Sequence, residues 1–138
     1  MRSTLVTDTG VVYAALVRSD RHHSACAGLL GSGHPVVIPN AVLVEAGLLG
    51  FRRGQPRVAD QLLGSVLDRS VEVYDTDHED HERIRDLMRQ YADLPLDLVD
   101  ATVVAVAERL EEDTIATLDR RHFSVVKPLH CEAFTLVP

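Results

Sequence analysis

The chain has 138 residues, which is enough for one domain with a single hydrophobic core and leaves no room for a second. Hydrophobic residues make up 46% of it, which excludes a disordered chain, and only 4% are aromatic, so the core must consist of valine, leucine, isoleucine and alanine. A formal charge of −7 is unusual for a nucleic-acid-binding protein, although local basic patches matter more than the total. No apolar run approaches the ~20 residues of a membrane span, so we expect a cytoplasmic protein without a membrane partner.

Strands and helices alternate through the first half of the chain. The expected elements are a strand over 5–7, helices over 11–17 and 22–30, a strand over 35–39, helices over 41–53 and 57–67, and a strand over 71–74. Local signals set the boundaries, because Gly31-Ser32-Gly33 closes the second helix and Gly54 stops the third. Asn40 is expected to cap the third helix.

The second half continues the alternation. Its expected elements are a charged, exposed helix over 77–91, an apolar helix over 98–110, a strand over 114–118, a turn over 119–123 and a strand over 133–137. Alternating strands and helices predict an α/β fold with a mostly parallel central sheet of about four to five strands. The sequence shows no repeat and no interdomain linker, so we expect a single domain over residues 1–138.

Glu45 is an acidic residue on an otherwise apolar part of the expected helix 41–53. Its neighbours on the helix surface, three and four residues away, are Ala41, Val42, Leu48 and Leu49. A carboxylate on a face that should be buried must be paired, protonated or bound to a metal. Pairing with Arg52 or Arg53 is the structural alternative, and a functional role is favoured over it.

Asp100 repeats this anomaly on the apolar helix 98–110. Its neighbours one turn later are Val103, Val104 and Ala107, which form the inner stripe of that helix. Asp100 could instead complement the helix dipole from the first turn. Asp97 is the better placed residue for the helix cap, and the two acids would exchange roles if the helix began later.

Asp8 and Asp119 each follow an expected strand, so both leave the sheet at its carboxyl edge. In open parallel sheets, ligands bind beyond that edge, near the point where the strand order reverses. Carboxylates that converge without a lysine or arginine beside each repel one another strongly. Magnesium or manganese, which prefer oxygen ligands, would relieve this repulsion, and such a site suits phosphodiester hydrolysis by a metal-activated water.

Four short stretches of the sequence, taken in order, carry a family resemblance. They are TDTG at 7–10, IPNAVLVE at 38–45, LPLDLVDA at 94–101 running into AVAERL at 105–110, and IATLDRRHF at 115–123. The ordered set resembles the PIN domain, and specifically the VapC toxins of type II toxin–antitoxin pairs. The resemblance implies a PIN-like three-layer α/β/α fold over the whole chain. It also implies that Asp8, Glu45, Asp100 and Asp119 form the acidic quartet of an endoribonuclease.

Further expectations follow from the same resemblance. Asp8, Glu45 and Asp100 would hold the main Mg²⁺ or Mn²⁺ ion, and Asp119 would hold or orient a second ion or the attacking water. Thr117 would support the site, and the product would carry a 5′-phosphate and a 3′-hydroxyl. The expected partners are RNA, a cognate antitoxin and a second copy of the chain in a homodimer. PIN domains generally place a serine or threonine two residues after the first aspartate, where this chain has Gly10; whether Thr9 replaces that hydroxyl stays open.

Basic residues near the quartet are candidates for phosphate contacts, with ordinary surface solubility as the alternative for each. These candidates are Arg18, Arg52, Arg53, Arg120 and Arg121. The histidines His22, His23 and His122 are expected to be surface or packing residues, because a metal-activated water needs no histidine base.

Two other functions compete with this interpretation. A receiver-like phospho-acceptor domain is also a small α/β fold with clustered aspartates, and here Asp75 ends a strand while Lys127 follows late. Such domains usually pair two acids after the first strand, whereas Thr9-Gly10 follow Asp8, and that reading leaves Glu45 unexplained. A catalytically silent PIN module that serves only in binding is the second alternative, and the intact quartet argues against it.

Overall fold

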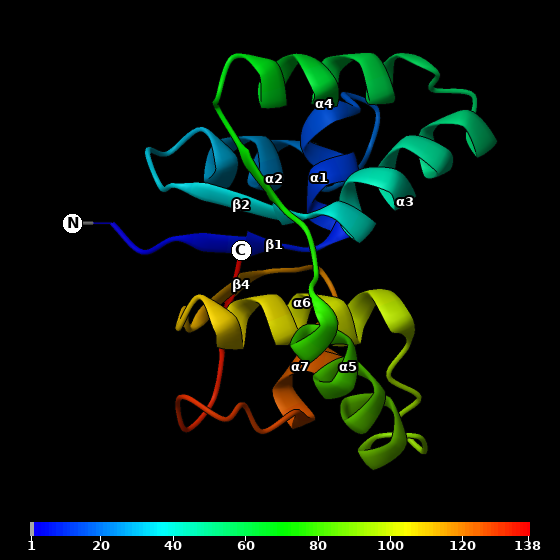
Figure 1. Ribbon diagram of the computed structural model, residues 1–138. Coiled ribbons are helices and arrows are strands. Elements are labelled where there is room, and N and C mark those ends of the chain that lie inside the picture. The colour runs from blue at the N-terminus through cyan, green and yellow to red at the C-terminus, as the bar shows by residue number, and fades with distance from the viewer. Residues whose placement is uncertain (1) are drawn as a thin grey trace.

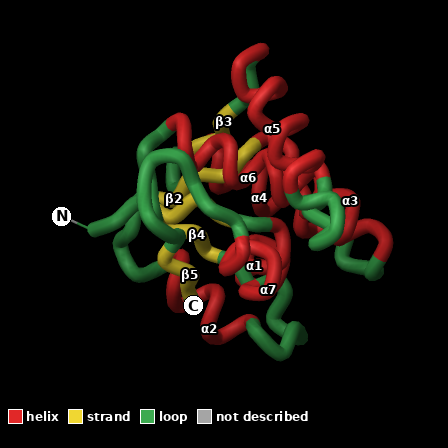
Figure 2. Tube along the Cα trace, turned by 90° about the horizontal axis from the view of Figure 1, so that it is seen from below, coloured by secondary structure: helices red, strands yellow, loops and turns green. Residues whose placement is uncertain are grey.

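The computed structural model describes residues 2–138 and contains a central sheet of five strands, all parallel, in the order β3-β2-β1-β4-β5. The strands are β1 (Leu5–Thr7), β2 (Val36–Pro39), β3 (Glu72–Tyr74), β4 (Thr114–Ala116) and β5 (Thr135–Val137). Figure 2 shows β3, β2, β4 and β5 following one another across the molecule. The first strand is therefore central, and the strand order reverses between β1 and β4.

Helices cover both faces of the sheet. They are α1 (Thr9–Leu16), α2 (His23–Leu30), α3 (Asn40–Arg52), α4 (Arg57–Leu67), α5 (His78–Gln90), α6 (Leu98–Arg109) and α7 (Arg120–Val125). Figure 1 shows α1–α4 on one side and α5–α7 on the other. Right-handed crossovers produce this division, because the chain moves outward from β1 to β3 and then returns across β1 to β4 and β5. The predicted three-layer α/β/α architecture is thus confirmed.

The most buried helix is α6, in which every residue from 100 to 107 is buried. It packs against α5, α3, β1 and β2. Its valines and alanines join those of the strands in one core, in which Phe123 is the one buried phenylalanine among residues 2–138. None of the helices in that described range is both long and apolar enough to cross a bilayer.

Most boundaries agree with the sequence prediction to within two residues, and the exceptions have local causes. Asn40 was expected to cap α3, but it is the first residue of that helix, follows Pro39 and makes no capping bond. The expected turn over 119–123 is instead the start of α7, because the Asp119 carboxylate accepts the backbone N–H of His122 and caps a helix. The first helix begins at Thr9, because Asp8 caps it.

Candidate active site at the carboxyl ends of the first and fourth strands

Asp8 leaves the central strand β1 and lies at the base of the site, with only 8% of its surface exposed. Its Oδ1 accepts the backbone N–H of Thr9 (2.8 Å), and its Oδ2 accepts the hydroxyl of Thr117 (3.0 Å). Burial raises the pKa of Asp8, and the negative charges of Glu45 and Asp119 raise it further, against the two hydrogen bonds that lower it. Asp8 is thus a rigidly held carboxylate whose environment favours a nearby cation.

Thr117 joins the ends of the two adjacent strands β1 and β4. While its buried hydroxyl donates to Asp8, the same oxygen accepts the backbone N–H of Asp119 (2.9 Å). One side chain therefore fixes the carboxylate of Asp8 and the backbone of Asp119, which are far apart in sequence. This placement agrees with the supporting role expected for Thr117.

Asp100 projects from the first turn of α6 toward the same point. The carboxylate of Asp97 caps α6 by accepting the backbone N–H of Asp100 (2.8 Å), which confirms the predicted cap. The side chain of Asp100 is only 12% exposed. Burial, with the charges of Asp97 and Asp8, raises the pKa of Asp100 to about 7. Asp100 is therefore a carboxyl group that ionises with difficulty unless a cation is near.

Asp119 and His122 complete the inner part of the site. The Oδ2 atom of Asp119 lies 2.5 Å from Nδ1 of His122, which lies 3.5 Å from Oδ2 of Asp100. Ligand atoms of these three residues all lie within 4.8 Å of one another. The expectation that His122 is a surface or packing residue was wrong. The i, i+3 spacing from Asp119 could have revealed it, had residues 120–125 been predicted as a helix.

Glu45 lies at the edge of the site rather than on a fully buried face. The buried residues of α3 are Val42, Ala46 and Gly50, whereas Leu48 is 49% exposed. The argument that apolar neighbours bury Glu45 was therefore only half correct. Glu45 is nevertheless close enough for its charge to raise the pKa of Asp8. The structure thus brings all four predicted carboxylates into one electrostatically coupled group.

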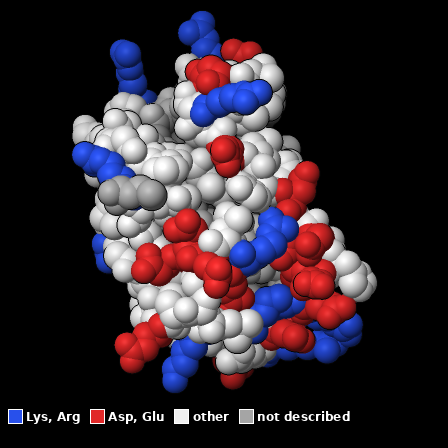
Figure 3. All heavy atoms as spheres, turned by 60° about the vertical axis from the view of Figure 1, so that its left-hand side comes forward, with Lys and Arg blue, Asp and Glu red and all other residues white. Residues whose placement is uncertain are grey.

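The arginines expected at the rim differ in their availability. Arg120 donates to the backbone carbonyls of Leu136 and Pro138, so it holds the last strand in place. The guanidinium of Arg53 lies over the ring of Tyr13, 5.0 Å from its centroid. Arg18, Arg52 and Arg121 are exposed, and no hydrogen bond or ion pair engages their side chains within residues 2–138. In the view of Figure 3, acidic and basic side chains are mixed, without a continuous basic surface.

The residues present fit a divalent cation. Among residues 2–138, no lysine or arginine forms an ion pair with any of the four carboxylates, so His122 is their one basic contact. The group offers carboxylate oxygens, which suit Mg²⁺ and Mn²⁺, and one imidazole nitrogen, which suits transition metals better than Mg²⁺. The hydroxyl of Thr9 is buried and has no partner in the described chain.

Comparison with known proteins agrees with this geometry. The family model of the PIN domain matches residues 5–128. Ribonuclease VapC26 of Mycobacterium tuberculosis is 26% identical over 135 residues, which is 97% of this chain and all of the relative. The crystal structure of Mycobacterium tuberculosis VapC20, a sarcin–ricin loop cleaving toxin, superposes with a TM-score of 0.78 at 24% identity, covering 86% of this chain and 91% of that one.

A toxin–antitoxin complex from Klebsiella pneumoniae contains a chain that superposes with a TM-score of 0.65 at 17% identity, over 91% of this chain and 92% of the other. These similarities confirm the likeness to VapC-type proteins that the four sequence stretches indicated. Together with the match of the family model over nearly the full length, they establish that the chain belongs to the PIN domain family.

Proposed function

We propose that this protein is a metal-dependent endoribonuclease toxin of the VapC type, folded as a single PIN domain over residues 1–138. The observation that carries the proposal is the convergence of Asp8, Asp100 and Asp119, with Glu45 beside them, where the strand order reverses between β1 and β4. Ligand sites of open parallel sheets lie at such points. The relative VapC26, which matches over 97% of this chain, is named a ribonuclease.

In this proposal Asp8, Glu45 and Asp100 hold the main ion, and Asp119 holds or orients a second ion or the attacking water. A bound Mg²⁺ or Mn²⁺ supplies activation of water and neutralises charge on the phosphate oxygens. The protein supplies fixed positions: Thr117 and the Thr9 N–H orient Asp8, the Asp97 cap fixes the start of α6, and His122 orients Asp119. The expected products carry a 5′-phosphate and a 3′-hydroxyl.

A cognate antitoxin belongs to the same proposal, as does assembly into a homodimer. The similar chain from Klebsiella pneumoniae comes from a toxin–antitoxin complex. This protein also exposes apolar side chains along α3 and α4, on which Phe51 is 66% exposed. They are Val44, Leu48, Phe51, Leu63 and Leu67. Exposed apolar groups gathered on adjacent helices support a protein partner.

The receiver-like alternative does not fit the topology. Receiver domains have the strand order 2-1-3-4-5, whereas this sheet has the order 3-2-1-4-5. The catalytically silent alternative is tested by activity. Cleavage of a labelled single-stranded RNA should require Mg²⁺ or Mn²⁺ and should be lost in Asp8→Asn, Glu45→Gln, Asp100→Asn and Asp119→Asn. Asp97→Asn is the control, because asparagine caps a helix as well as aspartate does.

The result that would contradict the proposal is equally specific. Wild-type protein that binds Mn²⁺ but leaves every RNA intact would indicate a silent PIN module. Cleavage that survives in Asp8→Asn or Asp100→Asn, or that persists with a chelator, would place the chemistry elsewhere. Loss of cleavage in Asp97→Asn with activity retained in Asp100→Asn would reverse the roles of these two acids on α6.

A further inference from the structure

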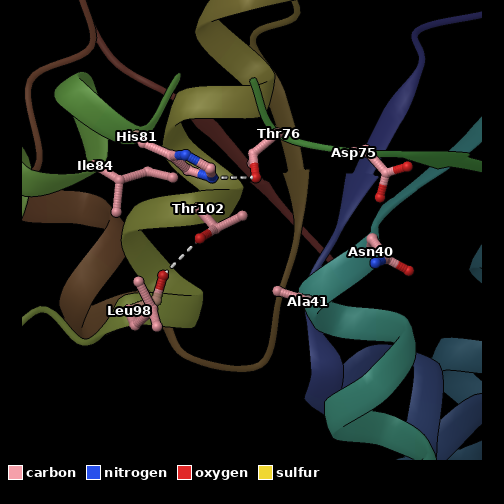
Figure 4. Close-up of a pocket in the computed structure, with 8 residues that line it drawn as sticks. All are labelled: Asn40, Ala41, Asp75, Thr76, His81, Ile84, Leu98 and Thr102. Atoms are coloured by element: carbon pink, nitrogen blue, oxygen red, sulfur yellow. Dashed lines mark hydrogen bonds between the residues drawn. The ribbon is translucent and has the colours of Figure 1, made fainter. Parts of the chain in front are cut away.

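A cavity of about 510 Å³ lies at the carboxyl edge of the sheet, beside the carboxylate site. Its walls come from the residues that directly follow β2 and β3 and from the first two turns of α5 and α6. Asn40 follows β2, and Asp75 and Thr76 follow β3 (Figure 4). The carboxyl ends of four neighbouring strands thus form two adjacent sites, one rich in carboxylates and one mixed in character.

The loop that carries Asp75 is held in place. Arg109 donates to the backbone carbonyl of Asp75 (3.0 Å), and the Thr76 hydroxyl is hydrogen-bonded to His81 (2.8 Å). Asp77 then caps α5 in a reciprocal capping box with Asp80. A loop fixed at three successive residues loses little conformational entropy when a ligand binds.

Two polar side chains of the cavity are unengaged. Thr102 donates to the backbone carbonyl of Leu98, and Thr76 is paired with His81. Asp75 and Asn40 are exposed residues, their side chains have no hydrogen-bond or ion-pair partner within residues 2–138, and Figure 4 shows both on the same side of the cavity. Apolar groups line much of the remainder. The cavity therefore offers free acceptors and donors above an apolar surface, as a site for a planar base requires.

The cavity shares its helices with the carboxylate site. Asn40 precedes Glu45 by five residues on α3, which is about 7.5 Å along the helix axis. On α6, Leu98 and Thr102 lie two residues before and after Asp100 and therefore project from the other side of the helix. The sheet brings the two sites together, because Asp8 follows β1 and Asn40 follows the paired strand β2, about 4.8 Å away. A nucleotide next to the phosphate at the carboxylates can therefore place its base in the cavity.

We propose that this cavity binds the base of a nucleotide adjacent to the cleaved phosphate, and that Asp75 selects guanine. The inference rests on the proposed ribonuclease function and names a determinant of its specificity. Single-stranded RNA is read through the Watson–Crick edges of its bases. Guanine alone presents two adjacent donors on that edge, N1–H and the N2 amine, which match the two oxygens of a carboxylate. The Asn40 amide can donate to O6 of the same base.

Adenine, cytosine and uracil fit the side chains of Asp75 and Asn40 less well than guanine does. The Watson–Crick edges of adenine and cytosine each offer one amine beside a ring nitrogen that accepts, and this nitrogen would face a carboxylate oxygen. Uracil places a carbonyl on each side of its single N–H. Unpaired or opposed polar groups of this kind are penalised when a base enters a site, so a carboxylate that pairs with guanine also discriminates against the rest.

Binding of mononucleotides to the full chain in a chelator tests this site separately from catalysis. Backbone amide NMR signals of residues 40–41 and 75–76 should shift with guanosine monophosphate. Affinity should fall about tenfold or more with inosine monophosphate, which lacks only the N2 amine, because a hydrogen bond to a charged group is lost. Asp75→Asn should remove the preference, whereas Asp60→Asn, an exposed acid on α4, should keep it.

Two further measurements complete the test. Asn40→Asp should weaken guanosine monophosphate, because it replaces the donor to O6 by an acceptor, and thermal melts of each variant exclude unfolding. Asp100→Asn should bind guanosine monophosphate as the wild type does, even though it should not cut RNA, so failure of the ribonuclease proposal is separable from failure of this one. Equal binding of guanosine, inosine and adenosine monophosphates, an unchanged preference in Asp75→Asn, or no binding at millimolar concentration would each overturn the guanine assignment.

Discussion

Replacing Asp100 by asparagine should stabilise the metal-free protein at pH 8. Asp100 is almost fully buried near Asp8 and Asp97, and these surroundings raise its pKa to about 7. At pH 8 the folded protein must therefore carry a buried negative charge that other carboxylates repel. Asparagine has nearly the same shape and removes that charge. Asp119 is less suitable for this test, because its carboxylate caps α7 and contacts His122.

The magnitude follows from the pKa difference. A rise from 3.8 to about 7 corresponds to about 4 kcal/mol, at about 1.4 kcal/mol per pH unit. Residual solvent contact and titration shared with a neighbouring group reduce this figure, so we expect Asp100→Asn to raise the free energy of unfolding by about 2 kcal/mol at pH 8. For a domain of this size, that difference is roughly 6–10 °C in melting temperature.

The pH determines whether Asp100 stabilises or destabilises the folded protein. A carboxyl group whose pKa is raised by folding stabilises the folded state fully below its unfolded pKa of 3.8, and this contribution is lost as the pH rises to about 7. In a chelator, the contribution of Asp100 to the free energy of unfolding of the wild type should therefore decrease between pH 4 and pH 7. Asp100→Asn should lack this pH dependence. Urea unfolding of both proteins at pH 5 and pH 8 measures the difference.

A matched control is Asp60→Asn on α4, which should change stability little at either pH, because Asp60 is exposed. If Asp100→Asn is less stable than the wild type at pH 8, the ionised carboxylate makes a net favourable contact, for example with His122. The site would then be electrostatically balanced without a metal, and the repulsion inferred for it would be wrong.

Three other substitutions test individual contacts. Thr117→Val should lower the free energy of unfolding by about 2 kcal/mol, because it removes the bonds to Asp8 and to the Asp119 backbone; urea unfolding measures this, and an unchanged midpoint would contradict it. His122→Gln should weaken Mn²⁺ and Mg²⁺ binding to a similar extent in calorimetric titrations, because His122 orients Asp119 rather than binding the ion; a loss confined to Mn²⁺ would make His122 a ligand instead. Gly10→Ser should raise the melting temperature by a few degrees, since its Cβ would meet only Leu118 at 3.7 Å, and a lower melting temperature would reveal strain.

The features that were predicted best from the sequence are those that local patterns of residues determine. The apolar strands and the polar residues that follow them placed Asp8 and Asp119 at one edge of a parallel sheet. The inner stripe of 98–110 placed Asp100 on the buried face of α6, with Asp97 as its cap. Only the reversal of strand order between β1 and β4, seen in the fold, explains why these acids meet.

Other features depend on contacts between distant residues. The hydroxyl of Thr117 bonds to Asp8 across 109 positions of sequence, so local patterns could not show it. The apolar stripe of α3 suggested burial around Glu45, but Leu48 and Phe51 of that helix are exposed. The role of His122 was missed because the short helix α7 after β4 has no apolar periodicity from which it could be predicted. The aspartate that caps α7 is nevertheless visible in the sequence.

Anomalous diffraction from crystals grown with Mn²⁺ tests the central claim most directly, because it locates the ion without reference to activity. The carboxylates at the ends of β1 and β4 should hold a Mn²⁺ ion with oxygens of Asp8 and Asp100 at a coordination distance of about 2.1 Å or through one water. An anomalous peak at that position would agree with the account. A Mn²⁺-dependent ribonuclease whose crystals show the ion elsewhere, with the Asp8 and Asp100 carboxylates unliganded, would contradict it.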